Sequence, residues 1–203
     1  MHVTREVIAC IANRIRPLLV GMVAKYDSEK YPTDVLGDLR GAFSERRIRP
    51  GDISRALIWK WGHTGKDNFP TRHRKLLALV EGFREDFLSL PEPVSARQTF
   101  DFWSRTLGRS RRFVSRSFLT HLQHHGDIGI IDQHNWRAMR ILLAQCRSDL
   151  TLTQLPRNYE DLLFASRFVR ALSEAMDTPR GQIDRFLMMY GKHLKRSFPS
   201  PTT

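Results

Sequence analysis

Apolar side chains recur every three or four residues along most of this chain, the spacing that places them on one face of an α-helix. The first such segment, residues 4–25, carries Val7, Ile11 and Ile15 on a single stripe. The pattern therefore predicts an almost entirely helical protein, with helices at residues 4–25, 35–43, 53–61, 71–88, 95–108, 111–124, 133–147, 159–176 and 182–195.

Glycine, proline and capping residues mark the breaks between these helices. Asp52 and Thr71 each precede an apolar segment and are expected to cap it. Residues 90–94 contain two prolines and are expected to form a linker, whereas residues 197–203 are expected to fray. A chain of 203 residues with these breaks fits one domain or two closely packed lobes.

Positive charge dominates the composition. The chain has 33 Lys and Arg residues against 21 Asp and Glu, which gives a formal charge of +12. This balance favours a polyanionic partner, because bound cations release counterions from phosphates. Hydrophobic residues make up 41% of the chain, enough for a sizeable core. No apolar run reaches the roughly 18 residues of a membrane span, and no signal peptide is apparent, so we favour nucleic acid over a membrane.

The number of cysteines limits the cofactors that the chain could bind and bears on its cellular compartment. Cys10 and Cys146 are the two cysteines of the chain, too few for a disulfide framework or a four-cysteine iron–sulfur cluster. Reduced thiols are the default in a cytosolic protein. We therefore expect free thiols, no cofactor and a cytoplasmic location.

One short segment concentrates the candidate chemistry. Residues 130–137 read Ile-Ile-Asp-Gln-His-Asn-Trp-Arg, so Asp132 stands directly before a predicted helix, with His134 and Arg137 in its first two turns. An aspartate at this position commonly caps the helix, because its oxygens accept hydrogen bonds from the first backbone N–H groups. A carboxylate that faces a cleft can also stabilise a cationic sugar and orient a water. Both roles can hold at once, and the spacing leaves them open.

A strongly basic turn lies about twenty residues before this aspartate. Its small residues let a backbone approach a phosphate closely, and the helix that follows offers its N-terminal N–H groups. A solvated charged face is the ordinary alternative. We predict a phosphate-binding hairpin that consists of Gly108, Arg109, Ser110, Arg111, Arg112 and Arg116.

Tryptophans near cations are candidate base contacts. Trp59 and Trp61 flank Lys60, and an aromatic face can stack on an extruded base while a lysine holds a phosphate. The alternative is that these tryptophans belong to the core. Residues two apart on a helix do not share a face, so one of the pair is freer for function than the other. Trp103 is the third candidate for the base pocket or wedge.

The histidine-rich segment does not match a metal site. Its histidines lie near Asp127, but their spacing fits no ordered zinc motif and no cysteine joins them. We predict no metal, and instead partly exposed histidines near a nucleic acid. The chain also lacks a Gly-x-Ser-x-Gly motif, a phosphate-binding P-loop and a dinucleotide fingerprint. The histidines concerned are His121, His124, His125 and His134.

Residues 106–143 resemble the helix-hairpin-helix DNA glycosylase superfamily, which includes endonuclease III. The family places a hairpin, a helix and a short connection before an apolar pair and Asp-x-His-x-x-Arg, which here occupies residues 130–137. The usual Leu-Pro-Gly-Val-Gly hairpin is replaced by Leu-Gly-Arg-Ser-Arg at residues 107–111. The resemblance implies an all-α, two-lobed helical bundle with a base-binding cleft between the lobes, approximately residues 1–28 with 145–203, and residues 29–144.

The resemblance also implies a function. Asp132 is then the catalytic aspartate of base excision in double-stranded DNA, and His134 and Arg137 support its turn. Bifunctional members carry a Schiff-base lysine 18–19 residues earlier, where this chain has Phe113 and Val114. We therefore expect a monomeric, monofunctional glycosylase of DNA repair or of defence against foreign DNA, which leaves an abasic site. Uracil, alkylated purines, oxidised guanine and modified cytosines all stay open as the excised base.

A non-catalytic helical DNA-binding module is the main alternative. Residues 172–194 have the outline of a helix-turn-helix, although their mixed charges favour packing against the N-terminal helix. If Asp132 is only a cap, its substitution costs stability rather than activity. A preference for single-stranded RNA would instead indicate an RNA-binding or protein-interaction domain.

Overall fold

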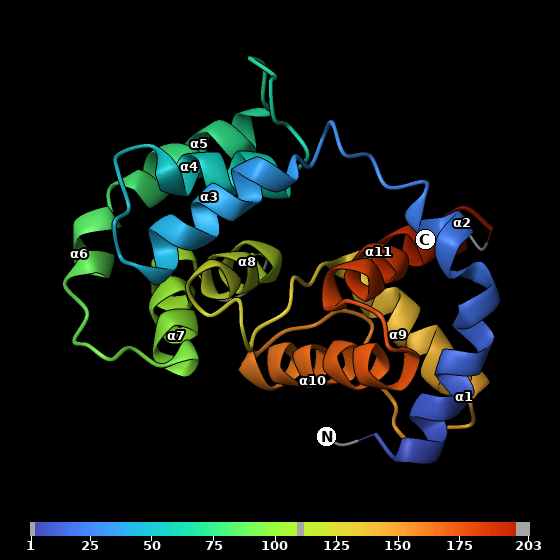
Figure 1. Ribbon diagram of the computed structural model, residues 1–203. Helices are drawn as coiled ribbons and strands as arrows, with labels where there is room; N and C mark the ends of the chain where they lie inside the picture. Colours follow the sequence, from blue (N-terminus) through green and yellow to red (C-terminus); the bar gives the residue numbers. More distant parts are fainter. Residues whose placement is uncertain (1–2, 109–111, 198–203) are drawn as a thin grey trace. The chain divides into compact units, whose positions relative to one another are not determined.

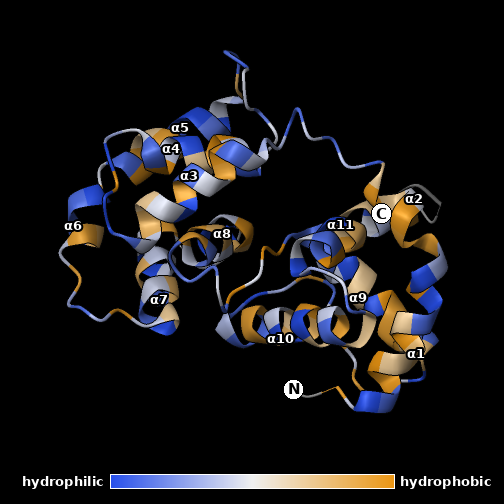
Figure 2. Ribbon diagram, viewed as in Figure 1, coloured by the Kyte–Doolittle hydropathy of each residue, from blue (hydrophilic) through white to orange (hydrophobic). Residues whose placement is uncertain are grey.

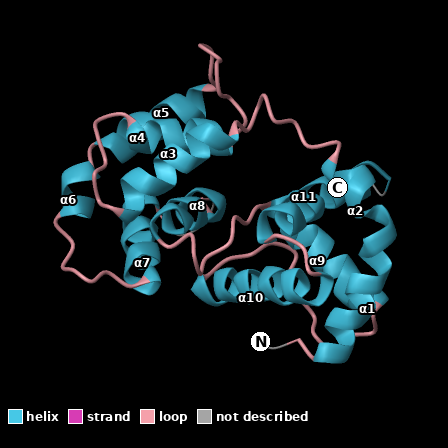
Figure 3. Ribbon diagram, in the orientation of Figure 1, coloured by secondary structure: helices cyan, strands magenta, loops and turns pink. Residues whose placement is uncertain are grey.

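The computed structural model of the protein describes residues 3–108 and 112–197 (Figure 1). Within these ranges the regular structure consists of α-helices and one short 3-10 helix, and no strand is present (Figure 3). The all-α prediction is therefore confirmed. None of the helices in these ranges is long and apolar enough to cross a membrane.

The chain folds into two compact units (Figure 1). Unit 1 combines Met1–Tyr26 with Gly129–Thr203, and unit 2 is Asp27–Ile128. The helices of unit 1 are α1 (Arg5–Ile15), η1 (Arg16–Leu18), α2 (Leu19–Val23), α9 (Gln133–Gln145), α10 (Tyr159–Met176) and α11 (Arg180–Ser197). Those of unit 2 are α3 (Thr33–Ser44), α4 (Asp52–Lys60), α5 (Thr71–Glu81), α6 (Arg84–Leu88), α7 (Ala96–Leu107) and α8 (Phe113–Gln123).

Two predicted helices are each broken in the structure. The segment predicted as one helix at residues 4–25 is interrupted after Ile15, because Pro17 lies in the 3-10 turn and lacks the N–H that continues an α-helix. The helix predicted at residues 71–88 ends at Glu81, and α6 begins at Arg84. Gly82 lies between them, and glycine is a weak helix former.

The boundary between the units also differs from the predicted lobes. We expected residues 129–144 in the same lobe as the middle helices, but α9 belongs to unit 1. The physical reason is its apolar stripe, which includes the buried Trp136, Met139 and Leu143, and which packs against α11 and α1. The Nε1–H of Trp136 donates a hydrogen bond of 2.8 Å to the carbonyl oxygen of Thr153. Apolar positions likewise run along α1 and α10 (Figure 2).

A disulfide joins the two chain segments of unit 1. Cys10 on α1 and Cys146 at the end of α9 are bonded, with their Cα atoms 6.0 Å apart. The expectation of two reduced thiols is therefore wrong. Residues 136 apart in the sequence meet because α1 packs against both α9 and α10. The inference from reduced thiols to a cytosolic compartment is withdrawn with that expectation.

Unit 2 has its own aromatic core. Trp103 of α7 lies against Phe87 of α6, with their ring centroids 4.9 Å apart, and both side chains are fully buried. Phe43 of α3 and Phe118 of α8 complete this core from the other helices. The predicted start of α7 at Ser95 is one residue early: Ser95 is the N-cap, whose side chain forms part of a capping box, and the helix begins at Ala96. Helices α7 and α8 pack against each other on either side of the basic turn.

Candidate functional site

Asp132 is the N-cap of α9. Its backbone is extended, and its Oδ1 accepts hydrogen bonds from the N–H groups of His134 at 2.7 Å and Asn135 at 3.0 Å. The residue is only 8% exposed, so this carboxylate is held close to backbone dipoles with little water around it. The prediction that Asp132 caps the helix is confirmed. A largely buried carboxylate at a helix N-terminus is also the arrangement that the catalytic hypothesis requires.

The first turn of α9 is fixed by α11. The side-chain amide of Asn135 donates to the Oδ1 of Asp184 at 2.7 Å and to its carbonyl oxygen at 3.1 Å. An Nη1–H of Arg137 donates to the carbonyl oxygen of Gly191 at 3.2 Å. The predicted supporting residue Arg137 thus holds the turn that carries Asp132.

His134 lies beside this turn as an uncharged ring. Burial lowers its pKa, and the nearby Asp132 only partly offsets that effect; Arg137 and two lysines of α11 lower it further. Its Nδ1 lies 3.1 Å from an Nη1 of Arg137. A neutral imidazole that contacts a guanidinium acts as an acceptor for it, which suits a supporting role rather than proton transfer.

The basic turn joins α7 to α8, and only its two ends are described. Gly108 follows α7 with φ +80°, a conformation that favours glycine, and a Cβ there would meet open space. Arg112 precedes α8, and its Nη1 donates to the carbonyl oxygen of Leu107 at 3.0 Å, so the two described ends are hydrogen-bonded to each other. The predicted phosphate contacts of Arg109, Ser110 and Arg111 lie outside the described residues.

Arg116 does not belong to a phosphate-binding surface, which corrects the prediction. Its side chain is buried, with the guanidinium 5.3 Å from the ring centroid of Phe100 and 5.9 Å from that of Phe113. An Nη1–H donates to the Oγ of Ser104 at 3.3 Å. Burial lowers the pKa of this guanidinium. Arg116 therefore joins α7 to α8 from the inside.

Two of the three predicted base-contacting tryptophans are core residues, again a correction. Trp59 is stacked on Phe118 with an interplanar angle of 9°, and its Nε1–H donates to the carbonyl oxygen of Pro32 at 2.8 Å. Trp103 is fully buried. A buried ring cannot stack on an extruded base unless the core opens. Trp61 is the one predicted base contact of the three that is not in the core: it is half-buried, and its ring is stacked on that of His73.

One histidine of the segment 121–125, His121, is less exposed than predicted. His121 is fully buried: its Nδ1 lies 2.5 Å from the carbonyl oxygen of Ile128, and its Nε2 accepts from Arg40. His124 is half-buried, with its Nε2 2.9 Å from the Oγ1 of Thr99. His125 is exposed as expected. Among the described residues, no group of three or more histidines, cysteines or acidic residues is placed to hold a metal ion.

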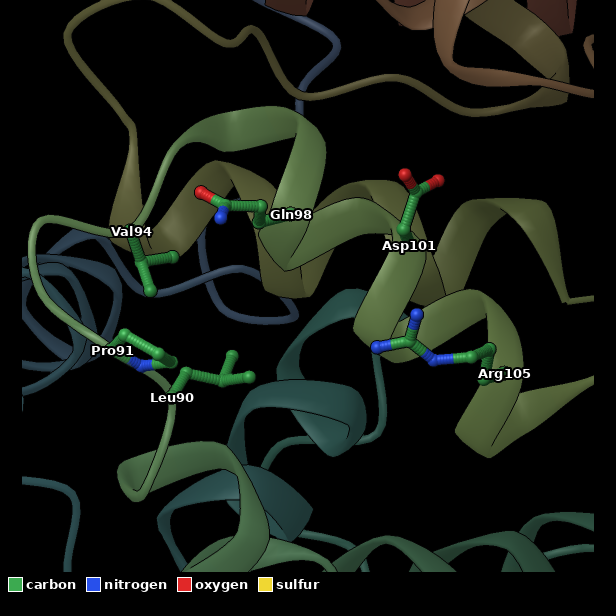
Figure 4. A pocket seen from close by; sticks show the side chains of 6 residues that line it. All are labelled: Leu90, Pro91, Val94, Gln98, Asp101 and Arg105. Carbon is green, nitrogen blue, oxygen red and sulfur yellow. The ribbon is translucent and has the colours of Figure 1, made fainter.

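A pocket of about 270 Å³ lies along α7 within unit 2. It has an apolar side and a polar side, and its one carboxylate accepts a hydrogen bond from the Nε of Arg97 at 3.1 Å. None of the predicted site residues lines it. Figure 4 shows its lining: Leu90, Pro91, Val94, Gln98, Asp101 and Arg105.

Sequence reasoning missed the residues that position the turn of Asp132. Asp184 and Gly191 lie about 50 and 60 residues further along the chain, and no local motif links them to α9. An isolated glycine within a helical pattern is a signal of close backbone approach, and Gly191 shows this signal. Asp184 has no comparable signal.

Comparison with known proteins identifies no relative, because no family model, curated protein or solved structure matches this chain.

Proposed function

We propose that this protein is a monofunctional DNA glycosylase, with Asp132 as its catalytic carboxylate. The observation that carries the proposal is the environment of that residue. Asp132 is 8% exposed and is held by two backbone N–H groups at the N-terminus of α9, directly after the sequence α7, basic turn, α8. This order of elements is the one expected for a helix-hairpin-helix glycosylase.

The composition of the units also supports the proposal. The resemblance implies that the N-terminal helix joins the C-terminal helices while the middle helices form a separate body. Unit 1 combines α1 and α2 with α9, α10 and α11, and unit 2 consists of the helices between them. The overall charge of +12 suits a DNA partner.

The proposed reaction hydrolyses one N-glycosidic bond. The target nucleotide leaves the duplex, since a stacked base cannot be reached. As the bond to the base breaks, positive charge develops on the sugar, and the Asp132 carboxylate stabilises it. The base leaves with the electron pair of the broken bond; a water adds to the sugar carbon, and the proton that it loses is balanced by the one that the departing base takes up, which gives a free base and an abasic site. No strand is cut, because no lysine stands at the Schiff-base position.

A non-catalytic DNA-binding module is the second candidate. It is favoured by one observation: both hydrogen bonds described for Asp132 are cap bonds, which are a sufficient structural reason for an aspartate at this position. The predicted packing of the last helix against the N-terminal segment is found, since α11 contacts α2, and this leaves less reason to regard residues 172–194 as a DNA-reading helix-turn-helix.

The deciding experiment is base release from duplexes that each contain one damaged or modified base. Uracil, alkylated purine, oxidised guanine and modified cytosine are tested, with alkali to cleave at abasic sites. We expect alkali-dependent cleavage of one substrate by the wild type and at least about 100-fold less by Asp132→Asn. Asparagine caps helices as well as aspartate, so the fold of this variant should be unchanged.

A matched control separates catalysis from structure. Asp161 is also a buried aspartate at a helix N-terminus of unit 1, where its Oδ2 accepts from the N–H of Arg157 at 2.7 Å. Asp161→Asn should keep the activity. Cleavage without alkali would indicate a lyase and contradict the monofunctional assignment. Tight, salt-sensitive DNA binding without release of any base would favour the second candidate.

A further inference from the structure

The connection between α4 and α5 gathers aromatic rings at the surface of unit 2. Trp61 directly follows α4, and its ring is stacked on that of His73 in the first turn of α5, with centroids 4.0 Å apart and an interplanar angle of 19°. His63 lies 5.4 Å from His73, and Phe69 lies 5.7 Å from His63. All four rings are half-buried, so each keeps some surface in contact with solvent.

Polar atoms in this cluster lack partners. The Nδ1 of His63, the Oγ1 of Thr64 and the Nδ1 of His73 are shielded from solvent, and none has a hydrogen-bond partner among the described residues. Shielded polar atoms without a partner cost free energy, and three in one place need an explanation. A ligand that carries both donors and acceptors would satisfy them.

The His73 ring is uncharged at neutral pH. Burial lowers its pKa, and the charges of Arg72 and His63 lower it further. A neutral ring pair is a surface for stacking rather than for ion pairing. The cations come instead from the neighbouring residues.

The first turn of α5 supplies positive charge beside the rings. It contains no acidic residue and no side-chain cap, since Pro70 is the N-cap, so its N-terminal N–H groups face outward from the helix end. Arg72, Arg74 and Lys75 are all exposed, and Lys66 is exposed in the connection. Between residues 60 and 75 the sequence has one acidic residue, Asp67.

From this juxtaposition we propose that the Trp61–His73 pair and the first turn of α5 form a binding site for single-stranded nucleic acid. An unpaired base stacks on the ring pair, and the phosphate beside it is bound by the basic helix N-terminus. The site lies wholly within unit 2 and does not use Asp132, so it goes beyond the proposed glycosylase and is tested independently of it.

The first test measures binding of a labelled oligothymidine and of heparin, a polyanion without bases. Trp61→Phe keeps an aromatic face, whereas Trp61→Leu keeps bulk without it. We expect Trp61→Leu to weaken oligothymidine binding by about 5- to 150-fold, the range for one stacked base. Trp61→Phe should retain most of the affinity, and heparin binding should be unchanged in both variants. Equal losses for heparin and oligothymidine, or no loss, would overturn the proposal.

Fluorescence gives a second readout in the wild type. The other three tryptophans, Trp59, Trp103 and Trp136, are at most 4% exposed, so quenching by a bound base reports mainly on Trp61. Quenching by oligothymidine but not by heparin is expected. Quenching that is equal for both ligands would contradict stacking.

A charge variant keeps the proposal testable if Trp61→Leu does not fold. All three cations of the α5 turn are exposed, so the triple variant Arg72→Gln, Arg74→Gln, Lys75→Gln should fold. It should reduce the slope of log Kd against log salt by about 2, at about 0.7 per lost phosphate contact on a single strand. The control variant replaces three arginines elsewhere on unit 2 with glutamine: Arg47, Arg55 and Arg97. Its slope of log Kd against log salt should stay close to that of the wild type. Equal effects of the two triple variants would mean non-specific attraction and overturn the site.

Discussion

The carbonyl oxygen of His134 lies where a side chain at position 191 would begin. A Cβ built on Gly191 would be 2.0 Å from that oxygen and 2.6 Å from its carbon, far inside van der Waals contact. Only the hydrogen of glycine allows α11 to approach the first turn of α9 so closely. The turn that carries Asp132 is therefore positioned by backbone-to-backbone contact.

Gly191→Ala should destabilise the protein by about 2 kcal/mol or more. The obstacle is backbone, which cannot rotate away as a side chain can, and overpacking of this kind costs about 1–3 kcal/mol. Gly181→Ala is the matched control on the same helix, where a Cβ meets open space. It should be neutral or stabilise by up to about 1 kcal/mol. Thermal unfolding of both variants gives the comparison, and equal stabilities would contradict the close contact.

Replacement of Asp132 should separate its two roles. Asp132→Ala removes an oxygen that accepts two N–H groups, so it should cost about 1 kcal/mol of unfolding free energy. Asp132→Asn keeps a capping oxygen and should lower the unfolding free energy by only about a few tenths of a kcal/mol. Urea unfolding of the two variants measures the difference. A large loss in Asp132→Asn would show that the carboxylate charge itself stabilises the fold.

Reduction of the disulfide should lower stability substantially. Cys10 and Cys146 are 136 residues apart, so the cross-link removes much conformational freedom from the unfolded chain, roughly 3–5 kcal/mol. Urea unfolding with and without dithiothreitol tests this value. The double variant Cys10→Ser, Cys146→Ser should resemble the reduced protein and show no response to the reductant.

The burial of His121 should make the fold sensitive to acid. Burial lowers the pKa of this histidine to about 3, with further contributions from the charge of Arg40 and, to a smaller extent, of His125 and Lys60; the hydrogen bond to Ile128 opposes them. In the unfolded chain this imidazole takes up a proton near pH 6.5, whereas in the folded protein it does so only near pH 3. The free energy of unfolding therefore has its full value above pH 6.5 and falls as the pH is lowered from 6.5 to 3.

The expected slope is up to about 1.4 kcal/mol per pH unit in that window. His121→Gln should flatten it, because glutamine can keep one donor and one acceptor but does not titrate. His125→Gln is the control at an exposed position of the same segment and should leave the slope unchanged. The free energy of unfolding, measured between pH 7 and pH 4, tests this prediction. Equal slopes against pH for wild type and His121→Gln would contradict the role given to His121.

The local parts of this fold could be predicted from the sequence. Helical spacing of apolar residues located the helices, and Asp132 was recognised as the residue that caps one of them. Local rules work here because a cap depends on residues only two or three positions away. The same rules placed two caps one residue too late, since Asp52 and Thr71 are each the first residue of their helix and the residue before each is its N-cap.

The exposure of the candidate site residues could not be predicted in the same way. Arg116 and Trp103 belong to residue types that bind nucleic acid, yet both are buried, Arg116 against Phe100 of α7 and Trp103 against Phe87 of α6. The disulfide was missed for the same reason, because it depends on the packing of α1 against α9. The pairing of Trp61 with His73 depends on how the intervening connection returns the chain, which no periodicity encodes.

The division of the chain into units has a consequence for its synthesis. Unit 2 is one uninterrupted stretch, whereas α1 finds its partners only after unit 2 has been made. A ribosome that adds about 5–20 residues per second needs roughly 7–27 s to pass from Cys10 to Cys146. During that interval the apolar side chains of α1, including Ile8, Ile11 and Ile15, have no native surface to cover them. Helix α1 is therefore synthesised before unit 2 but completes its packing after it, so its apolar face stays uncovered while unit 2 is being made.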